Sequence, residues 1–502
     1  MPKFKVSFEL FTLSGIIVIA AIIRLIALFN FGTYTFDDIF SVHFASLNLG
    51  QMFSLLQNEV HPPAYYLLLH FWIKFFGDNE IVTKLPSLFF SLGTMIVIYY
   101  LTKKILNRFS ATLATIIFAL SYFQIFSACQ ARMYPMLEFG GALSLLLFWQ
   151  IFVEKKKGLW LLYILTNSVM LLTHLGSLFA LATQGLWFLI LVWQKQIDKP
   201  KAKKFFLAQI PGVTLWLAWL VALFLPKLPT IINQGWYFSS TRNRNFAVGI
   251  YDYFFLLLKS YWLRFYSAVI ILAAPFMILL WPESKKNRQT PKQINPNWFL
   301  FAWLLPGLIV SAITQINYIR IFSISYLALY LIVAYFFYLL WLKQKKLFWF
   351  LITAWFLISL FTLSQNLFLQ FCRWDLGNQW LAQNEKPKDK IIISSYIYEL
   401  PFQRYYTGKN NFVGFYPIND NKTLDQRISE KNWQNLINTN NVGELQALIE
   451  GFDRVIIIFE VNSDDHYFSA PVHQWLTNNG WQIETSYKPD SFCGPQIIVY
   501  YK

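Results

Sequence analysis

Long apolar segments separated by short basic runs dominate this chain of 502 residues. Hydrophobic residues make up 56% of the sequence and charged residues only 14%, whereas an ordinary soluble domain carries roughly 25% charged residues. A segment of about 20 apolar residues is long enough to cross the hydrocarbon core of a bilayer. The pattern therefore predicts an α-helical polytopic membrane protein and excludes an ordinary soluble enzyme.

About eleven spanning helices are predicted from the apolar segments. The first follows a basic start, and no small-residue cleavage site precedes Phe31, which predicts an uncleaved helix and not a signal peptide. The predicted spans are residues 11–31, 81–103, 109–128, 134–153, 158–175, 176–193, 205–225, 258–281, 298–314, 321–342 and 347–366.

The basic residues predict the orientation of the chain. The net charge of +16 is spread over short runs between apolar segments and does not form one continuous face, so we expect no nucleic-acid partner. Such runs are retained on the cytoplasmic side. They lie at Lys103 to Arg108, Lys155 to Lys157, Lys195 to Lys204, Lys285 to Arg288 and Lys343 to Lys346. The remaining connections then face the extracytoplasmic side, and in a bacterium this membrane is the plasma (inner) membrane.

One apolar stretch, residues 64–76, is only thirteen residues long. We expect it to lie at the outer interface as a helix that begins after Pro62 and Pro63. If it crossed the bilayer instead, every later loop would change sides.

The pattern of apolar and polar residues changes near residue 370. Short apolar runs at 391–393, 455–458 and 496–500 are typical of buried strands, and residues 443–450 and 472–478 have helical character. We therefore expect two domains: a transmembrane domain, residues 1–369, and a small extracytoplasmic α/β domain, residues 370–502. Cys372 and Cys493 fall on the same side and either form one disulfide or remain isolated thiols.

Acidic side chains follow the first span directly. Asp37 and Asp38 offer a carboxylate that can deprotonate an acceptor hydroxyl or hold a divalent metal ion. Alternatively, they cap an interfacial helix or are solvated charges. Ionisable groups at a membrane boundary are costly, which makes this loop a candidate site.

Cationic side chains fall on the same predicted side. His61, with Glu59 two residues before it, can donate to a phosphate, ligate a metal or simply end a polar loop. Arg132 lies between two predicted helices, and Arg320 opens another. Guanidinium groups there suit bidentate phosphate binding, although snorkelling to lipid headgroups also explains them.

An ordered series of motifs runs through the amino-terminal part of the chain. The motifs are Asp37-Asp38, His61-Pro62-Pro63 with residues 64–72, Phe76-Gly77, Glu80, Lys84-Leu85-Pro86-Ser87 and Gln130-Ala131-Arg132-Met133-Tyr134. This series resembles the amino-terminal half of the family 39 type glycosyltransferases, which are membrane enzymes of the GT-C superfamily related to protein O-mannosyltransferases and lipid A aminoarabinose transferases. The resemblance covers about residues 8 to 200 well and the later helices only by pattern.

The resemblance implies an activity. A sugar on a polyprenyl phosphate carrier is transferred to an acceptor on the extracytoplasmic side by a single inverting displacement, beside the membrane lipids. The acceptor is a protein, a lipid or another glycan. By position, Asp37 is the base, and Asp38 stands where relatives carry Glu, which puts any metal or acceptor contact of that residue in doubt.

The resemblance also implies which residues bind the carrier phosphate. His61 inherits the role of a phosphate-binding cation, and Arg320 matches a second phosphate ligand. Arg132 and Tyr134 belong to the same set. His174 recurs in the pattern without an assigned role. Glu59 and Glu80 are further candidates, and Lys84 is taken as structural.

Two other classes remain open. A transporter or flippase usually places its charges near the bilayer midplane, often on broken helices. A ligase of lipid-linked glycans shares the carrier and the side of the membrane. It is expected to have a long late loop with Arg and His, whereas residues 226–253 are short and carry Arg242 and Arg244 but no His.

Overall fold

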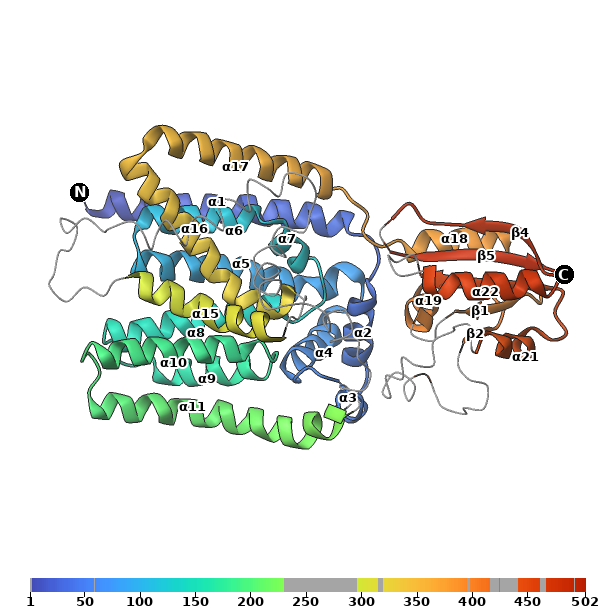
Figure 1. Cartoon of the computed structure of the whole chain (residues 1–502), viewed down its shortest axis with the longest axis horizontal. Helices are drawn as coiled ribbons and strands as arrows, with labels where there is room; N and C mark the ends of the chain where they lie inside the picture. Colours follow the sequence, from blue (N-terminus) through green and yellow to red (C-terminus); the bar gives the residue numbers. More distant parts are fainter. Residues whose placement is uncertain are drawn as a thin grey trace. The chain divides into compact units, whose positions relative to one another are not determined.

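The chain forms two compact units in the computed structural model, and each is described by itself (Figure 1). Unit 1 comprises Met1–Ile26, His61–Leu68 and Lys84–Leu367, and unit 2 comprises Ala27–Val60, Leu69–Thr83 and Phe368–Lys502. The described residues are 2–57, 59–229, 296–314, 319–394, 398–415, 424, 441–460, 466–491 and 493–502.

Seven helices in the described part of the chain are long and apolar enough to cross a membrane. They are α1 (Pro2–Asn30), α5 (Glu80–Ile105), α8 (Tyr134–Phe148, continued by a π turn at Trp149–Val153), α11 (Lys199–Trp219, continued by Leu220–Phe224), α15 (Pro296–Thr314), α16 (Ser323–Lys343) and α17 (Lys345–Asn366). The prediction of a multi-pass helical membrane protein is confirmed.

Shorter helices occupy three of the other predicted spans. The span predicted at 109–128 is a bent pair, α6 (Arg108–Leu120) and α7 (Tyr122–Ala128), with 62° between the two. It breaks at Ser121 because the backbone there is extended, with ψ of 116°. The spans predicted at 158–175 and 176–193 are shorter, α9 (Trp160–Leu171) and α10 (Ser177–Trp193), because a turn takes up the residues between them. The span predicted at 258–281 lies outside the described residues.

Helix α16 forms the centre of unit 1. In its most apolar window 89% of the residues are buried, against 17% for α11 and 11% for α17. It packs against α6, α8, α10, α15 and α17. A helix that is apolar all round and buried belongs in a core, whereas exposed apolar faces such as those of α11 and α17 suit contact with lipid.

Unit 2 contains a five-stranded sheet with the order β2-β1-β3-β5-β4. Strand β1 is parallel to β2 and β3, and β5 is antiparallel to β3 and β4. The strands are β1 (Lys390–Ile393), β2 (Phe412–Gly414), β3 (Arg454–Glu460), β4 (Gln482–Tyr487) and β5 (Pro495–Tyr501). The three strands predicted from apolar runs are confirmed, and β2 and β4 are additional.

Helices cover both faces of this sheet. Helices α18 (Trp374–Asn384) and α19 (Glu399–Tyr405) contribute Trp374 and Phe402 to the core that contains Ile391 and Ile393. Helices α21 (Leu445–Ile449) and α22 (His466–Asn478) contribute Leu445 and Val472 to the opposite core, which contains Ile392. A 3-10 turn, Val442–Glu444, leads into α21. Burial on both faces explains the uninterrupted isoleucine runs of β1 and β3.

Three more helices follow α1 and precede α5 in the sequence. These are α2 (Phe36–Ser46), α3 (Leu49–Leu56) and α4 (Ala64–Phe76). Helix α4 has the bounds expected for the thirteen-residue apolar stretch, and its interfacial position stays a prediction.

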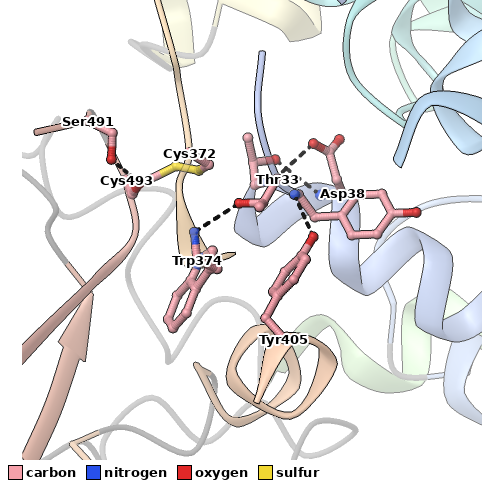
Figure 2. The surroundings of a disulfide bond; sticks show 9 residues. Thr33, Asp38, Cys372, Trp374, Tyr405, Ser491 and Cys493 are labelled. Carbon is pink, nitrogen blue, oxygen red and sulfur yellow. Dashed lines mark hydrogen bonds between the residues drawn. A yellow bond between two sulfur atoms is a disulfide. The ribbon is translucent and has the colours of Figure 1, made fainter. Parts of the chain in front are cut away.

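Cys372 and Cys493 form a disulfide, which decides between the two possibilities left open by the sequence (Figure 2). The bridge joins the segment before α18 to the start of β5. The third cysteine, Cys129, is a buried thiol.

Candidate functional site

Two arginines and two histidines gather around Tyr134 in unit 1. The rings of His61 and His174 stack with 5.0 Å between their centroids, and the Tyr134 ring lies 5.4 Å from His174. Arg132 Nη2 is 3.4 Å from His61 Nε2. The guanidinium carbons of Arg132 and Arg320 lie 5.9 Å and 5.5 Å from the centre of the Tyr134 ring. We call these five residues the cationic cluster.

Backbone and hydroxyl contacts bring the cluster together. The N–H of Ala64 donates to the carbonyl of Leu172 at 2.9 Å, which places the His-Pro-Pro loop beside the turn that carries His174. Ser87 donates to the carbonyl of Arg132 at 2.9 Å, and Tyr65 Oη lies 3.3 Å from Ser87 Oγ. The serine of the Lys-Leu-Pro-Ser motif therefore fixes the loop that carries Arg132, a role that the sequence did not reveal.

A glycine allows the turn between α9 and α10 to approach the segment that carries Arg320. The N–H of Gly176 donates to His174 Nδ1 at 2.9 Å. A Cβ atom at Gly176 would lie only 2.7 Å from the carbonyl oxygen of Ile321. Any side chain at this position would therefore push the His174 turn away from Arg320.

His174 is a neutral member of the cluster. It lies in the turn outside the spanning helices, and burial lowers its pKa well below the ordinary value, helped by the neighbouring His61, Arg132 and Arg320. Since Nδ1 accepts from Gly176, the proton of neutral His174 is on Nε2. The two guanidinium groups and the histidine donors suit a phosphate, because arginine binds phosphate through paired hydrogen bonds.

The acidic pair lies in the first turn of α2, in unit 2. Asp38 is fully buried and accepts a hydrogen bond from the N–H of Thr35 at 3.1 Å, while Thr35 Oγ1 accepts from the N–H of Asp38 at 3.2 Å. This is a capping box, the alternative that the sequence left open for the pair. Asp37 is half-buried, and the hydroxyl of Ser41 donates to its backbone carbonyl at 3.1 Å.

The further candidates have local roles. Glu59 accepts from the N–H of Val60 at 3.2 Å, next to His61. Glu80, in unit 2, accepts from Tyr405 Oη at 2.8 Å. Among the residues that the structure describes, no group of three or more His, Cys, Asp or Glu side chains is placed to hold a metal ion.

Sequence reasoning missed a buried polar network among the helices of unit 1. Arg24 on α1 donates to Ser91 Oγ at 3.0 Å. Gln124 on α7 donates to Glu138 Oε1 at 3.2 Å and lies 3.4 Å from the hydroxyl of Tyr330 on α16. Arg24 and Glu138 are fully buried. The sequence feature that could have indicated this network is a single charged residue within an apolar segment, as at Arg24 and Glu138, because a charged side chain is costly in a membrane.

Comparison with known proteins supports the predicted resemblance. Residues 60–223 match the family model described as dolichyl-phosphate-mannose-protein mannosyltransferase. This range contains every member of the cationic cluster except Arg320. No curated protein matches the chain.

Solved structures share the fold over nearly the whole chain. ArnT from Cupriavidus metallidurans bound to undecaprenyl phosphate is 10% identical, with a TM-score of 0.56 over 96% of this chain and 97% of that one. The apo form of the same protein gives 12% identity, a TM-score of 0.53 and the same coverage of both chains. The oligosaccharyltransferase of Archaeoglobus fulgidus is 12% identical, with a TM-score of 0.50 over 96% of this chain and 72% of that one.

The fold of the chain is thus similar to that of ArnT, and residues 60–223 match the mannosyltransferase family model.

Proposed function

We propose that this protein moves a sugar from a polyprenyl phosphate carrier to an acceptor on the extracytoplasmic side of a bacterial inner membrane. The acceptor is a protein, a lipid or a glycan. The cationic cluster is the observation that carries the proposal, because it gathers two guanidinium groups and two imidazoles around one tyrosine. Such a cluster suits a phosphate with two negative charges.

The cluster would bind the phosphate of the carrier in both the substrate and the product. When the bond between the anomeric carbon and the phosphate oxygen breaks, the electron pair leaves with the phosphate and negative charge grows there. Arg132 and Arg320 would stabilise that charge, which is the usual way in which fixed cations accelerate such a step. Neutral His174 would donate through Nε2.

Asp37 would accept the proton of the acceptor as the acceptor attacks the anomeric carbon from the opposite face. One displacement of this kind inverts the configuration. The position of Asp37 in the first turn of α2 favours its charged form, since the positive end of the helix dipole lies there. Asp38 would keep that turn in place through the capping box.

The similar proteins agree with this donor. The similar ArnT structure was solved with undecaprenyl phosphate, and the matched family is described by a dolichyl phosphate sugar. Both carriers are polyprenyl phosphates. The similarity in fold does not indicate which sugar is transferred. The proposal is therefore tested in cells, where the natural donor is present.

Mass spectrometry of membrane lipids from cells that lack the protein tests the proposal. We expect a polyprenyl phosphate sugar to accumulate and one glycan decoration to disappear. Wild-type protein should restore both, whereas Arg132→Ala should fail, because loss of one charge-stabilising donor costs about 10²- to 10³-fold in rate.

The matched control is Arg108→Ala. Arg108 is an exposed arginine of unit 1 whose ion-pair contact with Glu9 is 4.0 Å long. This variant should restore the wild-type lipid pattern. Unchanged lipids and glycans in the deletion strain would contradict the proposed donor.

A further inference from the structure

Three segments of unit 2 meet at Tyr34, three residues before Asp37. The N–H of Tyr34 donates to Tyr405 Oη at 3.1 Å, and Tyr405 Oη donates in turn to Glu80 Oε1 at 2.8 Å. The hydroxyl of Tyr34 donates to the carbonyl of Asp78 at 2.6 Å. One hydroxyl, that of Tyr405, therefore joins the chain before α2 to the start of α5.

Arg404, next to Tyr405 at the end of α19, also contacts the residues around Tyr34. Its guanidinium contacts Asp78 twice, with Nη1 at 2.6 Å from Oδ2 and Nη2 at 2.9 Å from the carbonyl oxygen. Its Cζ atom also lies 5.9 Å from the centre of the Tyr34 ring. Paired hydrogen bonds from one arginine fix orientation as well as distance.

A second attachment lies beside the disulfide (Figure 2). The N–H of Thr33 donates to the carbonyl of Cys372 at 2.9 Å, and the N–H of Trp374 donates to Thr33 Oγ1 at 3.1 Å. Gly32 has φ of +87°, and a Cβ atom there would lie 2.2 Å from the Cys372 carbonyl oxygen. Only glycine permits this close approach of the two backbones.

These attachments act on a short helix. Helix α2 has 11 residues, and a helix of that length is marginal without tertiary contacts. Its first residue, Phe36, packs edge-on against Tyr398, with 5.8 Å between the ring centres. The N-terminal turn that carries Asp37 is thus fixed by residues from the C-terminal part of the chain.

The two phenols keep their protons at the pH of any assay. Burial raises the pKa of Tyr34 and of Tyr405 far above the ordinary value, and the neighbouring charge of Glu80 raises the pKa of both further. Tyr405 therefore remains both a donor to Glu80 and an acceptor from Tyr34.

We propose that Tyr405 is a positioning residue for sugar transfer, and that the C-terminal α/β domain holds the Asp37 turn in its working place. This inference rests on the proposed function, because Asp37 receives its role there. It gives the C-terminal domain a part in the reaction that does not depend on binding an acceptor.

The test compares Tyr405→Phe with Tyr406→Phe in the full-length protein. Both variants remove one hydroxyl and keep the ring, and the two residues are adjacent. Tyr406 Oη donates to Glu385 at 2.7 Å and accepts from the N–H of Asn410 at 3.0 Å, so its bonds stay within residues 385–410. Amide hydrogen exchange of residues 33–40 and the steady-state kinetics of sugar transfer are measured for each.

For Tyr405→Phe we expect exchange of the amides of residues 33–40 to rise about tenfold, because the N–H of Tyr34 loses its acceptor and the bond from residue 405 to Glu80 is lost. We expect kcat to fall about tenfold or more, since a misplaced catalytic group is costly. KM for the donor should change by less than about twofold, because the phosphate contacts are untouched. Tyr406→Phe should match the wild type in both measurements.

Equal exchange of residues 33–40 in the two variants would overturn the inference, and so would raised exchange with an unchanged kcat. A wild-type protein that transfers no sugar from a polyprenyl phosphate donor would instead refute the proposed function. The exchange data separate these failures, because they report on the held segment without any substrate.

Discussion

Removal of the disulfide should destabilise the protein by an amount that depends on the length of chain that the bridge encloses. Cys372 and Cys493 are 121 residues apart in sequence. Loop-closure entropy assigns a bridge of this span about 5 kcal/mol of stability, and measured values for disulfides are typically about 2–4 kcal/mol. We expect replacement of both cysteines by serine to destabilise unit 2 by about 3 kcal/mol.

The assay is proteolysis of the full-length, solubilised protein across a urea gradient, with cleavage of residues 368–502 as the signal. With a urea dependence of about 2 kcal/mol per molar, the double variant should unfold at roughly 1.5 M less urea than the wild type. Cys129→Ala is the matched control, because it removes the one cysteine that lies outside the bridge. A double variant with the same midpoint as this control would refute the reasoning.

Three shorter predictions concern unit 1. Arg24→Met should lower stability in thermal unfolding by about 1–3 kcal/mol, because Ser91 and the carbonyl of Ala119 lose a buried hydrogen-bond donor, and an unchanged melting temperature would contradict this. Folded His174 stays neutral while the unfolded chain binds a proton below pH about 6.5, so stability should fall by about 1.4 kcal/mol per pH unit below that value. His174→Gln should flatten this fall, and equal slopes for both proteins would contradict the cause given. Gly176→Ala should cost about 1–3 kcal/mol and raise KM for the donor, since its Cβ would collide with the Ile321 carbonyl; an unchanged KM would speak against the placement of Arg320.

The sequence predicted the elements that carry a strong local pattern. Each predicted span in the described part of the chain contains helix, and the isoleucine runs at 391–393 and 455–458 are central strands. These runs are apolar on both faces because helices cover both sides of the sheet. Strand β4 was missed since it is largely exposed and polar, and it forms only through its pairing with β5.

Contacts between residues far apart in the sequence could not be predicted, because they are not accompanied by a local sequence pattern. The N–H of Thr33 donates to the carbonyl of Cys372, far along the sequence, and every residue possesses these backbone groups. For this reason the sequence did not show that the segment before α2 groups with the C-terminal part of the chain.

The candidate site was predicted residue by residue but not as a geometry. Motif order singled out His61, Arg132, Tyr134 and Arg320, and the structure shows that they gather around the tyrosine ring together with His174. The contact that fixes Arg132 comes from Ser87, a residue of the Lys-Leu-Pro-Ser motif whose distant partner no local pattern indicates. The base role of Asp37 stays a prediction.

The measurement that tests the central claim most directly is sugar transfer by the purified protein in lipid nanodiscs supplied with a polyprenyl phosphate sugar. Asp37→Asn should lower the rate of transfer by about 10²- to 10⁴-fold, because the acceptor loses its base, while donor binding stays at the wild-type level. Asp490→Asn, which changes an exposed carboxylate of unit 2, should transfer at the wild-type rate. Wild-type transfer by Asp37→Asn would contradict the account.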